Sequence, residues 1–127
     1  MDCGDSEGFT IALVDDDPRI RDLLTSELQD LGFSVFSFAD AFDFLAILPS
    51  SRFDLILLDI ILPQIDGIEC LRRLRMLVPD ARVVVFSALN DSSIRAQAEL
   101  LGSLGYILKP DLFDDPAAVL SPFLKVS

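Results

Sequence analysis

The stretch that decides the fold is residues 53–67, FDLILLDIILPQIDG. An apolar run, Leu55 to Leu58, leads into a single acid, Asp59, and turn residues follow. A short apolar run bounded by turn residues is typical of a strand buried on both faces, as in a parallel sheet covered by helices. An ionised carboxylate is costly inside such a strand, so we expect Asp59 at the C-terminal end, where open α/β sheets bind ligands. Taken alone, this stretch is equally consistent with a functional aspartate and with an aspartate that only begins a turn.

The composition limits the class of protein. The chain has 127 residues, enough for one domain with a sizeable core, and 51% of them are hydrophobic. Ten basic against 21 acidic residues give a net charge of −11, which argues against direct binding of nucleic acid or of an anionic membrane. Two cysteines, Cys3 and Cys70, provide neither a disulfide framework nor a metal-ligand spacing, so the cytoplasm is the expected location. We expect a mobile segment over residues 1–8, no signal peptide or membrane span, and one domain over residues 9–127.

From residue 9 onward, strand-like and helix-like patterns alternate. Such alternation, with right-handed crossovers, predicts one parallel sheet covered by helices on both faces. The last helix contains Pro122, which costs about 3 kcal/mol in a helix interior, so we expect that helix to be short, kinked or broken near Ser121. Strands are predicted over residues 9–14, 33–38, 55–59, 81–86 and 105–108, with helices capped by Asp17, Asp40, Asp66, Asn90 or Asp91, and Asp115.

Two helices carry side chains whose placement the spacing predicts. In the first helix the apolar residues at helical spacing are Ile20, Leu23, Leu24, Leu28 and Leu31. In the third helix an apolar stripe leaves Arg72, Arg73 and Arg75 outside, where they are expected to form a solvated face.

Polar residues follow four of the predicted strands. Parallel strands end at the same edge of a sheet, so these side chains should gather there. Three carboxylates held close together repel one another and need a cation, and with oxygen ligands and no histidine the expected ion is Mg²⁺. A hydroxyl and an ammonium beside it suit a phosphoryl group, which predicts phosphoryl transfer to or from a carboxylate. The residues are Asp15 and Asp16, Asp59, Ser87 and Lys109.

In combination these motifs resemble the receiver domain of two-component response regulators, over about residues 10–110. The shared features are an acidic pair after the first strand, an aspartate ending the third with proline four and glycine eight residues later, Ser-Ala after the fourth, and Lys-Pro after the fifth. The resemblance implies a flavodoxin-like, doubly wound, five-stranded parallel sheet with strand order 2-1-3-4-5. It also implies a domain that is not an enzyme for an external substrate. Such a domain takes its phosphoryl group from a histidine kinase or a histidine phosphotransfer protein and later assists its hydrolysis.

The resemblance also implies a role for each site residue. Asp59 would be the phosphoacceptor, and a switch aromatic, Tyr106, would turn inward as Ser87 moves toward the phosphate. An ordinary packed tyrosine fits position 106 as well. The implied residues are Asp15, Asp16, Asp59 and the carbonyl of Ile61 for Mg²⁺, with Asp15 acting through a water; Asp59, Ser87 and Lys109 for the phosphoryl group; and Ser87 and Tyr106 for the switch.

Phosphorylation would change the affinity for an output domain or a downstream protein, and the domain would be a monomer or a phosphorylation-dependent dimer. One departure from the family concerns Ile61 and Leu89, each two residues beyond a site residue. Neither offers a polar group to orient a water, so we expect a comparatively long-lived phosphorylated form.

Two other interpretations stay open. The first is a phosphohydrolase similar to the haloacid dehalogenase superfamily, with Asp15 as nucleophile, Asp17 as acid and base, and a further acidic pair at residues 114–115. The second is a receiver-like module that binds proteins and is never phosphorylated. Loss of phosphorylation or turnover in Asp59→Asn and Asp15→Asn variants separates the three.

Overall fold

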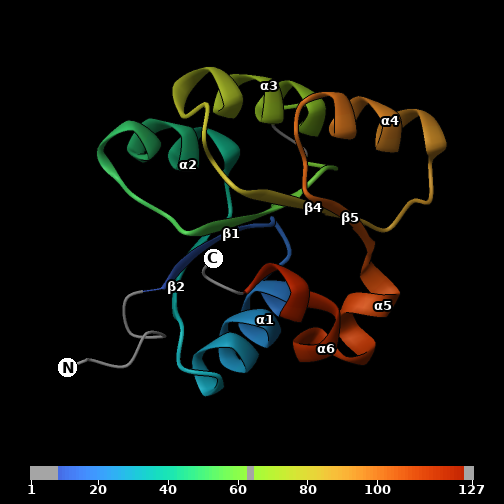
Figure 1. Cartoon of the computed structure of the whole chain (residues 1–127). Coiled ribbons are helices and arrows are strands. Elements are labelled where there is room, and N and C mark those ends of the chain that lie inside the picture. The colour runs from blue at the N-terminus through green and yellow to red at the C-terminus, as the bar shows by residue number, and fades with distance from the viewer. Residues whose placement is uncertain (1–8, 63–64, 125–127) are drawn as a thin grey trace.

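The computed structural model describes residues 9–62 and 65–124, so the segment predicted to be mobile, residues 1–8, lies outside the described residues. Five strands form one parallel sheet in the order β2-β1-β3-β4-β5, which confirms the predicted strand order (Figure 1). The strands differ from the predicted ranges by two residues or fewer at their ends. They are β1 (Thr10–Val14), β2 (Ser34–Phe38), β3 (Leu55–Asp59), β4 (Val83–Ser87) and β5 (Gly105–Leu108).

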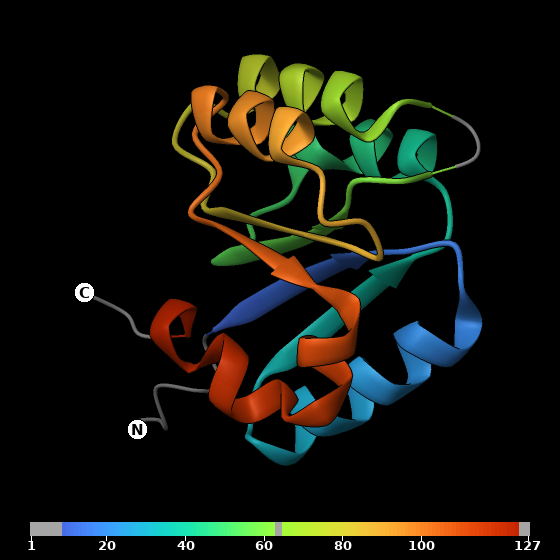
Figure 2. The same cartoon turned by 90° about the vertical axis from the view of Figure 1, so that its right-hand side faces the viewer.

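Helices cover both faces of this sheet (Figures 1 and 2), as the alternating pattern predicts. One face carries α1, α5 and α6, and the other carries α2, α3 and α4. No helix within the described residues is long and apolar enough to cross a membrane. The helices are α1 (Pro18–Asp30), α2 (Ala41–Ile47), α3 (Gly67–Leu77), α4 (Ser92–Leu100), α5 (Lys109–Asp114) and α6 (Pro116–Leu120), with short 3₁₀ turns η2 (Leu48–Ser50) and η3 (Ser121–Phe123).

The central strand β3 is buried on both faces, as its apolar run predicts. Leu55 and Leu57 pack in the core beneath α1 and α6, whereas Ile56 and Leu58 pack in the core beneath α2 and α3. All five residues of β3 are no more than 1% exposed, and Asp59 is its last residue. The fully buried strand β3 therefore places the carboxylate of Asp59 at the edge of the sheet.

Aspartates cap the helices where the sequence predicts them. In each case a side-chain oxygen accepts a hydrogen bond from a backbone N–H of the first turn, which satisfies a donor that has no partner within the helix. The caps are Asp17 for α1, Asp40 for α2, Asp66 for α3, Asp91 for α4 and Asp115 for α6.

The apolar stripe of α1 is narrower than its leucines suggest. Ile20, Leu24 and Leu28 are buried, whereas Leu23 and Leu31 are 38% and 44% exposed. The three buried residues follow one another at intervals of four, which places them in a single row facing the sheet. These three residues form the face of α1 that packs against the sheet, and Leu23 and Leu31 lie at the edge of that face.

The expectation of a solvated face on α3 is wrong for Arg75. Arg72 and Arg73 are exposed and pair with Glu69, as expected of surface residues. Arg75 instead reaches the adjacent end of α4, where the last carbonyl oxygens of a helix have no partner within it. Its guanidinium donates hydrogen bonds to the carbonyl oxygens of Pro79, Ala81, Leu101 and Gly102 at 2.9, 2.7, 2.9 and 3.3 Å.

The C-terminal region contains one helix more than the sequence predicts. The helix α5 begins directly at Lys109, with Pro110 in its first turn, where a missing N–H costs nothing. The predicted break near Ser121 is confirmed, because α6 ends at Leu120 and gives way to η3.

Candidate functional site

The C-terminal ends of β1, β3 and β4 bring three polar side chains to one edge of the sheet. Asp15, Asp59 and Ser87 are 0%, 1% and 0% exposed, and within the described residues they are the buried polar or charged side chains. Lys109 follows β5 as the first residue of α5 and extends over the same edge. The convergence predicted from the strand ends is therefore present in the structure.

Lys109 joins the two buried aspartates. Its Nζ atom donates a hydrogen bond to Oδ2 of Asp59 at 2.9 Å and lies 3.3 Å from Oδ2 of Asp15. The other carboxylate oxygens accept from backbone N–H groups, with Ile61 donating to Asp59 at 2.9 Å and Asp17 to Asp15 at 2.8 Å. Each carboxylate is thus fixed by one backbone donor and one shared ammonium.

The site holds more negative charge than its own cation balances. Burial raises the pKa of Asp59 to about 6, against the lowering effects of the Ile61 N–H and of Lys109. Burial also raises the pKa of Asp15. Although burial works against it, the pKa of Lys109 is raised by its contacts with the two carboxylates. One ammonium facing two buried carboxylates leaves a demand for further positive charge.

The arrangement of carboxylates fits a hard divalent cation. Asp15, Asp16 and Asp59 each offer an oxygen, and these oxygens all lie within 4.8 Å of one another. Oδ2 of Asp15 is buried, and within the described part of the chain its one polar contact is the ion pair with Lys109 Nζ at 3.3 Å, so it keeps a lone pair for a metal or for a water bound to one. Asp16 is exposed and forms the open side of the cluster. Oxygen donors with an open side are what Mg²⁺ prefers.

The described residues on the two sides of the loop after Asp59 lie close together at the start of α3. Ile61 and Asp66 form an antiparallel bridge, and Gly67 packs against the backbone of Ile60. A Cβ atom at position 67 would lie 1.8 Å from the carbonyl oxygen of Ile60, so only glycine fits. This glycine, eight residues after Asp59, sets the path of the segment whose Ile61 carbonyl is the predicted metal ligand.

Ser87 and Tyr106 are connected through the loop after β4. The Oγ atom of Ser87 accepts a hydrogen bond from the N–H of Leu89 at 3.0 Å. The hydroxyl of half-buried Tyr106 donates to the carbonyl oxygen of Leu89 at 2.7 Å. The guanidinium carbon of Arg95 lies 4.7 Å from the centre of the Tyr106 ring, a cation–π contact. A continuous set of contacts therefore runs from the buried edge to the surface of β5.

The acidic residues that the hydrolase interpretation requires are not brought into the site. Asp17 caps α1, and Arg19, which hydrogen-bonds and pairs with its carboxylate, lowers its pKa. Asp114 and Asp115 are exposed at the end of α5, where no strand ends. Asp59, for which that scheme has no role, is instead at the centre of the cluster. The haloacid dehalogenase interpretation is therefore not favoured.

Sequence reasoning missed Arg21. Its Nη1 atom donates a hydrogen bond to the backbone carbonyl oxygen of Asp15 at 2.7 Å, which fixes the turn that presents the acidic pair. The signal available in the sequence was its position one turn after the cap Asp17.

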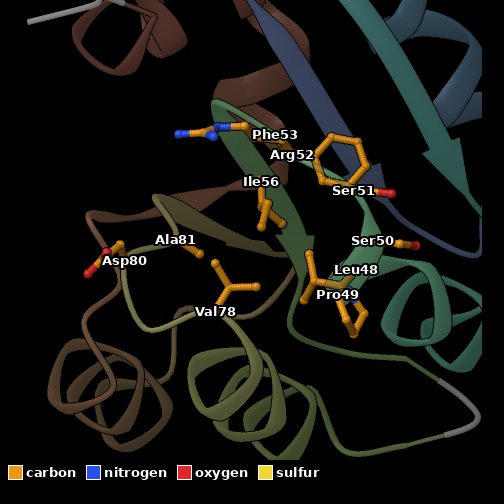
Figure 3. A pocket seen from close by; sticks show the side chains of 10 residues that line it. All are labelled: Leu48, Pro49, Ser50, Ser51, Arg52, Phe53, Ile56, Val78, Asp80 and Ala81. Carbon is orange, nitrogen blue, oxygen red and sulfur yellow. The ribbon is translucent and has the colours of Figure 1, made fainter.

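A separate pocket of about 500 Å³ lies at the opposite edge of the sheet, before β3 and β4 (Figure 3). The side chains of Leu48, Ile56 and Val78 surround it, whereas Arg52 and Asp80 lie at its periphery. It contains none of the converging strand-end residues and takes no part in their chemistry.

Comparison with known proteins agrees with this geometry. The model of the response regulator receiver domain matches residues 11–117. Sporulation initiation phosphotransferase F of Bacillus subtilis is 32% identical over 114 residues, which cover 90% of this chain and 92% of that protein. The transcriptional regulatory protein FixJ of Bradyrhizobium diazoefficiens is 33% identical over 83% of this chain, and the match spans 50% of FixJ.

Solved structures of response regulators have the same fold as this chain. The chemotaxis protein CheY4 of Vibrio cholerae has a TM-score of 0.82 and 25% identity, covering 91% of this chain and 98% of CheY4. The response regulator TrrA of Thermotoga maritima, in complex with Mg²⁺ and beryllium fluoride, has a TM-score of 0.79 and 28% identity, with 91% and 99% coverage.

The fold, the acidic edge and these matches define a phosphoryl-accepting switch domain. The chain belongs to the response regulator receiver domain family of two-component signalling. The flavodoxin-like fold and the family predicted from the motifs are both confirmed.

Proposed function

We propose that Asp59 of this chain accepts a phosphoryl group and that its phosphorylation switches the binding of a partner protein. The observation that carries the proposal is the position of Asp59, buried at the end of β3 with Lys109 Nζ at 2.9 Å and oxygens of Asp15 and Asp16 within 4.8 Å. A buried carboxylate with a raised pKa in a charged cluster is typical of a functional group rather than of a structural one.

The transfer of a phosphoryl group from the donor to Asp59 needs no acid from outside the site. A carboxylate oxygen of Asp59 attacks phosphorus, the bond between phosphorus and the donor breaks, and the leaving group departs with the electron pair. The chain contains no histidine, so a phosphohistidine donor must belong to a histidine kinase or a histidine phosphotransfer protein. Because the chain modifies only itself in this scheme, it is a switch and not an enzyme for an external substrate.

Mg²⁺ would be held by Asp16, Asp59 and the carbonyl of Ile61, with Asp15 acting through a water. When bound, the ion supplies positive charge to the oxygens of the phosphoryl group. The buried Oδ2 of Asp15, which contacts Lys109 Nζ at 3.3 Å but has a lone pair left, and the open side at Asp16 support this assignment.

Lys109 and Ser87 would bind the transferred group. The ammonium of Lys109, already beside Asp59, pairs with a phosphoryl oxygen, and the hydroxyl of Ser87 donates to another. Movement of Ser87 toward the phosphate would change its contact with Leu89, whose carbonyl oxygen holds the Tyr106 hydroxyl. Phosphorylation thereby shifts an equilibrium at the face of α4 and β5.

The output of the whole protein follows the same scheme. FixJ is twice as long as the region matched here, so relatives exist in which a receiver is one part of a longer protein. We propose that this receiver acts in the cytoplasm and controls either an attached output domain or a separate downstream protein.

Mass spectrometry of the intact protein and its peptides tests the proposal directly. After incubation with Mg²⁺ and acetyl phosphate, we expect a labile added phosphoryl group on Asp59 that is absent from Asp59→Asn. Absence of any adduct would favour a receiver that binds proteins without being phosphorylated. Turnover that survives Asp59→Asn but not Asp15→Asn would restore the hydrolase interpretation.

A further inference from the structure

The strand β2 lies at one side of the sheet (Figures 1 and 2), and among the described strands β1 is its one partner. The N–H of Ser34 donates to the carbonyl oxygen of Phe9, just before β1, at 3.2 Å. Backbone groups alternate in direction along a strand, so those of Val35 and Ser37 point away from β1. The outer side of β2 therefore presents the N–H and C=O groups of two residues that no described strand pairs with.

Nothing in β2 blocks the approach of another strand. Edge strands of soluble proteins are commonly protected by a charged side chain, a proline or a bulge. Residues 33–38, FSVFSF, contain no charge and no proline, although the chain has a net charge of −11. The strand pairs with β1 residue for residue, without a bulge. Phe36 is 52% exposed, with its ring centre 6.1 Å from that of Phe53. This side of the sheet is therefore uncharged and partly aromatic.

A second copy of the chain matches the outer side of β2 by two-fold symmetry. In an antiparallel pair centred on Phe36, Val35 of each copy lies opposite Ser37 of the other. Both residues have outward backbone groups, so each of the two opposed pairs can exchange two N–H···O hydrogen bonds. An axis at Val35 or at Ser37 would leave only one such pair within β2. The register centred on Phe36 therefore satisfies the most backbone groups of this strand.

The same register places Phe36 opposite Phe36 of the second copy. Residues of this pair exchange no hydrogen bonds with each other, and in such pairs the opposed side chains approach most closely, which favours aromatic contacts. No carboxylate lies within the paired residues 34–38. The absence of charge favours a second copy as the partner, because two chains of net charge −11 repel each other wherever acidic surfaces meet.

We propose that two copies of this chain associate through β2, as an antiparallel strand pair centred on Phe36 that joins their sheets into one. The association is weak, because five residues from each copy bury less surface than a stable dimer needs. The two strands run in opposite directions, so the two Asp59 side chains lie at opposite ends of the joined sheet. Each copy therefore keeps its acidic cluster open to a phosphoryl donor, and the inference stands whether or not Asp59 is phosphorylated.

Sedimentation of the full chain, without Mg²⁺ or a phosphoryl donor, tests the association. Over a series from about 10 μM to about 1 mM, the mean mass should rise from that of a monomer toward that of a dimer, with a Kd of about 0.1 to 1 mM. A mass that stays monomeric over the whole series would overturn the proposal. Association that requires Mg²⁺ and beryllium fluoride would place the contact on another surface and would also overturn it.

Proline at position 37 tests the hydrogen bonds of the strand pair. The N–H of Ser37 points away from β1, so Ser37→Pro removes a donor that the sheet of the monomer does not use. By symmetry the dimer loses one hydrogen bond in each opposed pair, and the affinity should fall about tenfold or more. Ser37→Ala keeps the N–H and, as the matched control, should associate like wild type. Equal association of the two variants would contradict the proposal.

Charges at position 36 test the register and do not depend on whether the fold tolerates proline. Phe36→Lys and Phe36→Glu should each abolish association, because like charges would face each other across the two-fold axis. An equimolar mixture of the two variants should associate about tenfold more tightly than either variant alone, because lysine then faces glutamate. This recovery requires position 36 of one copy to lie opposite position 36 of the other. A mixture that associates no better than the single variants would overturn the proposed register.

Discussion

Lys109, the first residue of α5, hydrogen-bonds through Nζ to Oδ2 of Asp59, the last residue of β3, at 2.9 Å. The two residues are 50 positions apart in the sequence, and the contact closes the acidic edge of the sheet. The same ammonium lies 3.3 Å from Asp15, so a single cation serves two buried carboxylates. Several properties of the protein should follow from this imbalance.

Replacement of Asp59 by asparagine should stabilise the metal-free protein. Burial raises the pKa of Asp59 from 3.8 to about 6, so at pH 7 the folded state contains an ionised carboxylate that burial destabilises. Removing this charge should add about 2 to 3 kcal/mol to the free energy of unfolding. The penalty is absent at low pH, where the carboxyl group is protonated in both states, and develops as pH rises from about 4 to about 6. Urea unfolding in EDTA across this range measures it.

The control for this prediction is Asp16→Asn. Asp16 is exposed, so its replacement should change the stability by less than about 0.5 kcal/mol. A destabilised Asp59→Asn variant would mean that the contact with Lys109 outweighs the cost of burying the carboxylate.

Loss of the ammonium should have the opposite effect. Lys109→Met leaves Asp15 and Asp59 buried without their shared cation, and breaking a buried ion pair in this way costs about 3 kcal/mol or more. We expect Mg²⁺ to recover part of the loss. Thermal unfolding with and without the ion is the measurement, and Arg72→Met, which breaks an exposed pair with Glu69, should cost less than about 1 kcal/mol. Equal losses in the two variants would contradict the prediction.

Binding of Mg²⁺ should stabilise the wild-type protein in proportion to the logarithm of its concentration. Above the dissociation constant, each tenfold rise should add about 1.4 kcal/mol to the free energy of unfolding. Asp15→Asn and Asp59→Asn should both weaken this response, because each removes one of the clustered carboxylates. Calorimetric scans over a series of concentrations check the slope, and a response that both variants retain would place the ion elsewhere.

Sequence reasoning predicted most of this site because its signals are local. The apolar run before Asp59 and the acids after Val14 mark strand ends directly, and parallel strands bring such ends together. The position of Arg75 was not predictable in this way. Its acceptors, such as the carbonyl oxygen of Leu101, 26 residues away, become its neighbours only when α3 and α4 pack side by side. The start of α5 was missed because Lys109 and Pro110 match the end of a strand as well as the first turn of a helix.

Substitution of Gly67 should disrupt the protein more than substitution of another glycine. A Cβ atom there would lie 1.8 Å from the Ile60 carbonyl oxygen, within rigid backbone, so Gly67→Ala should cost more than about 3 kcal/mol or prevent folding. Gly102 has a positive φ of 83°, and the atom nearest to an added Cβ would be a side-chain nitrogen of Arg75 at 3.2 Å, not rigid backbone. Gly102→Ala should therefore cost only about 1 kcal/mol. Urea midpoints compare the two, and similar values would contradict the prediction.

The lifetime of the phosphorylated form should depend on Ile61. This side chain is 45% exposed two residues beyond Asp59, in a position to face an attacking water but without a polar group to orient one. An amide could supply that group, so Ile61→Asn should shorten the lifetime about tenfold or more. Loss of the phosphoryl adduct can be followed by mass spectrometry, with Ile61→Leu as the apolar control. Rapid loss from wild type that Ile61→Asn leaves unchanged would contradict the prediction.

The hydrogen bonds of Arg75 fix one end of α4 and leave the other end without such an anchor. They connect its C-terminal end to α3, whereas its N-terminal end follows the loop whose Leu89 is hydrogen-bonded to Ser87 and Tyr106. A helix of nine residues is about 13 Å long, so a rotation of roughly 10° about the tied end displaces the other end by about 2 Å. If α4 rotated about its contacts with Arg75, the displacement would be largest beside Leu89 and smallest beside Gly102. Loss of the Arg75 hydrogen bonds should let α4 shift as a whole and make the unphosphorylated and phosphorylated forms less different from each other.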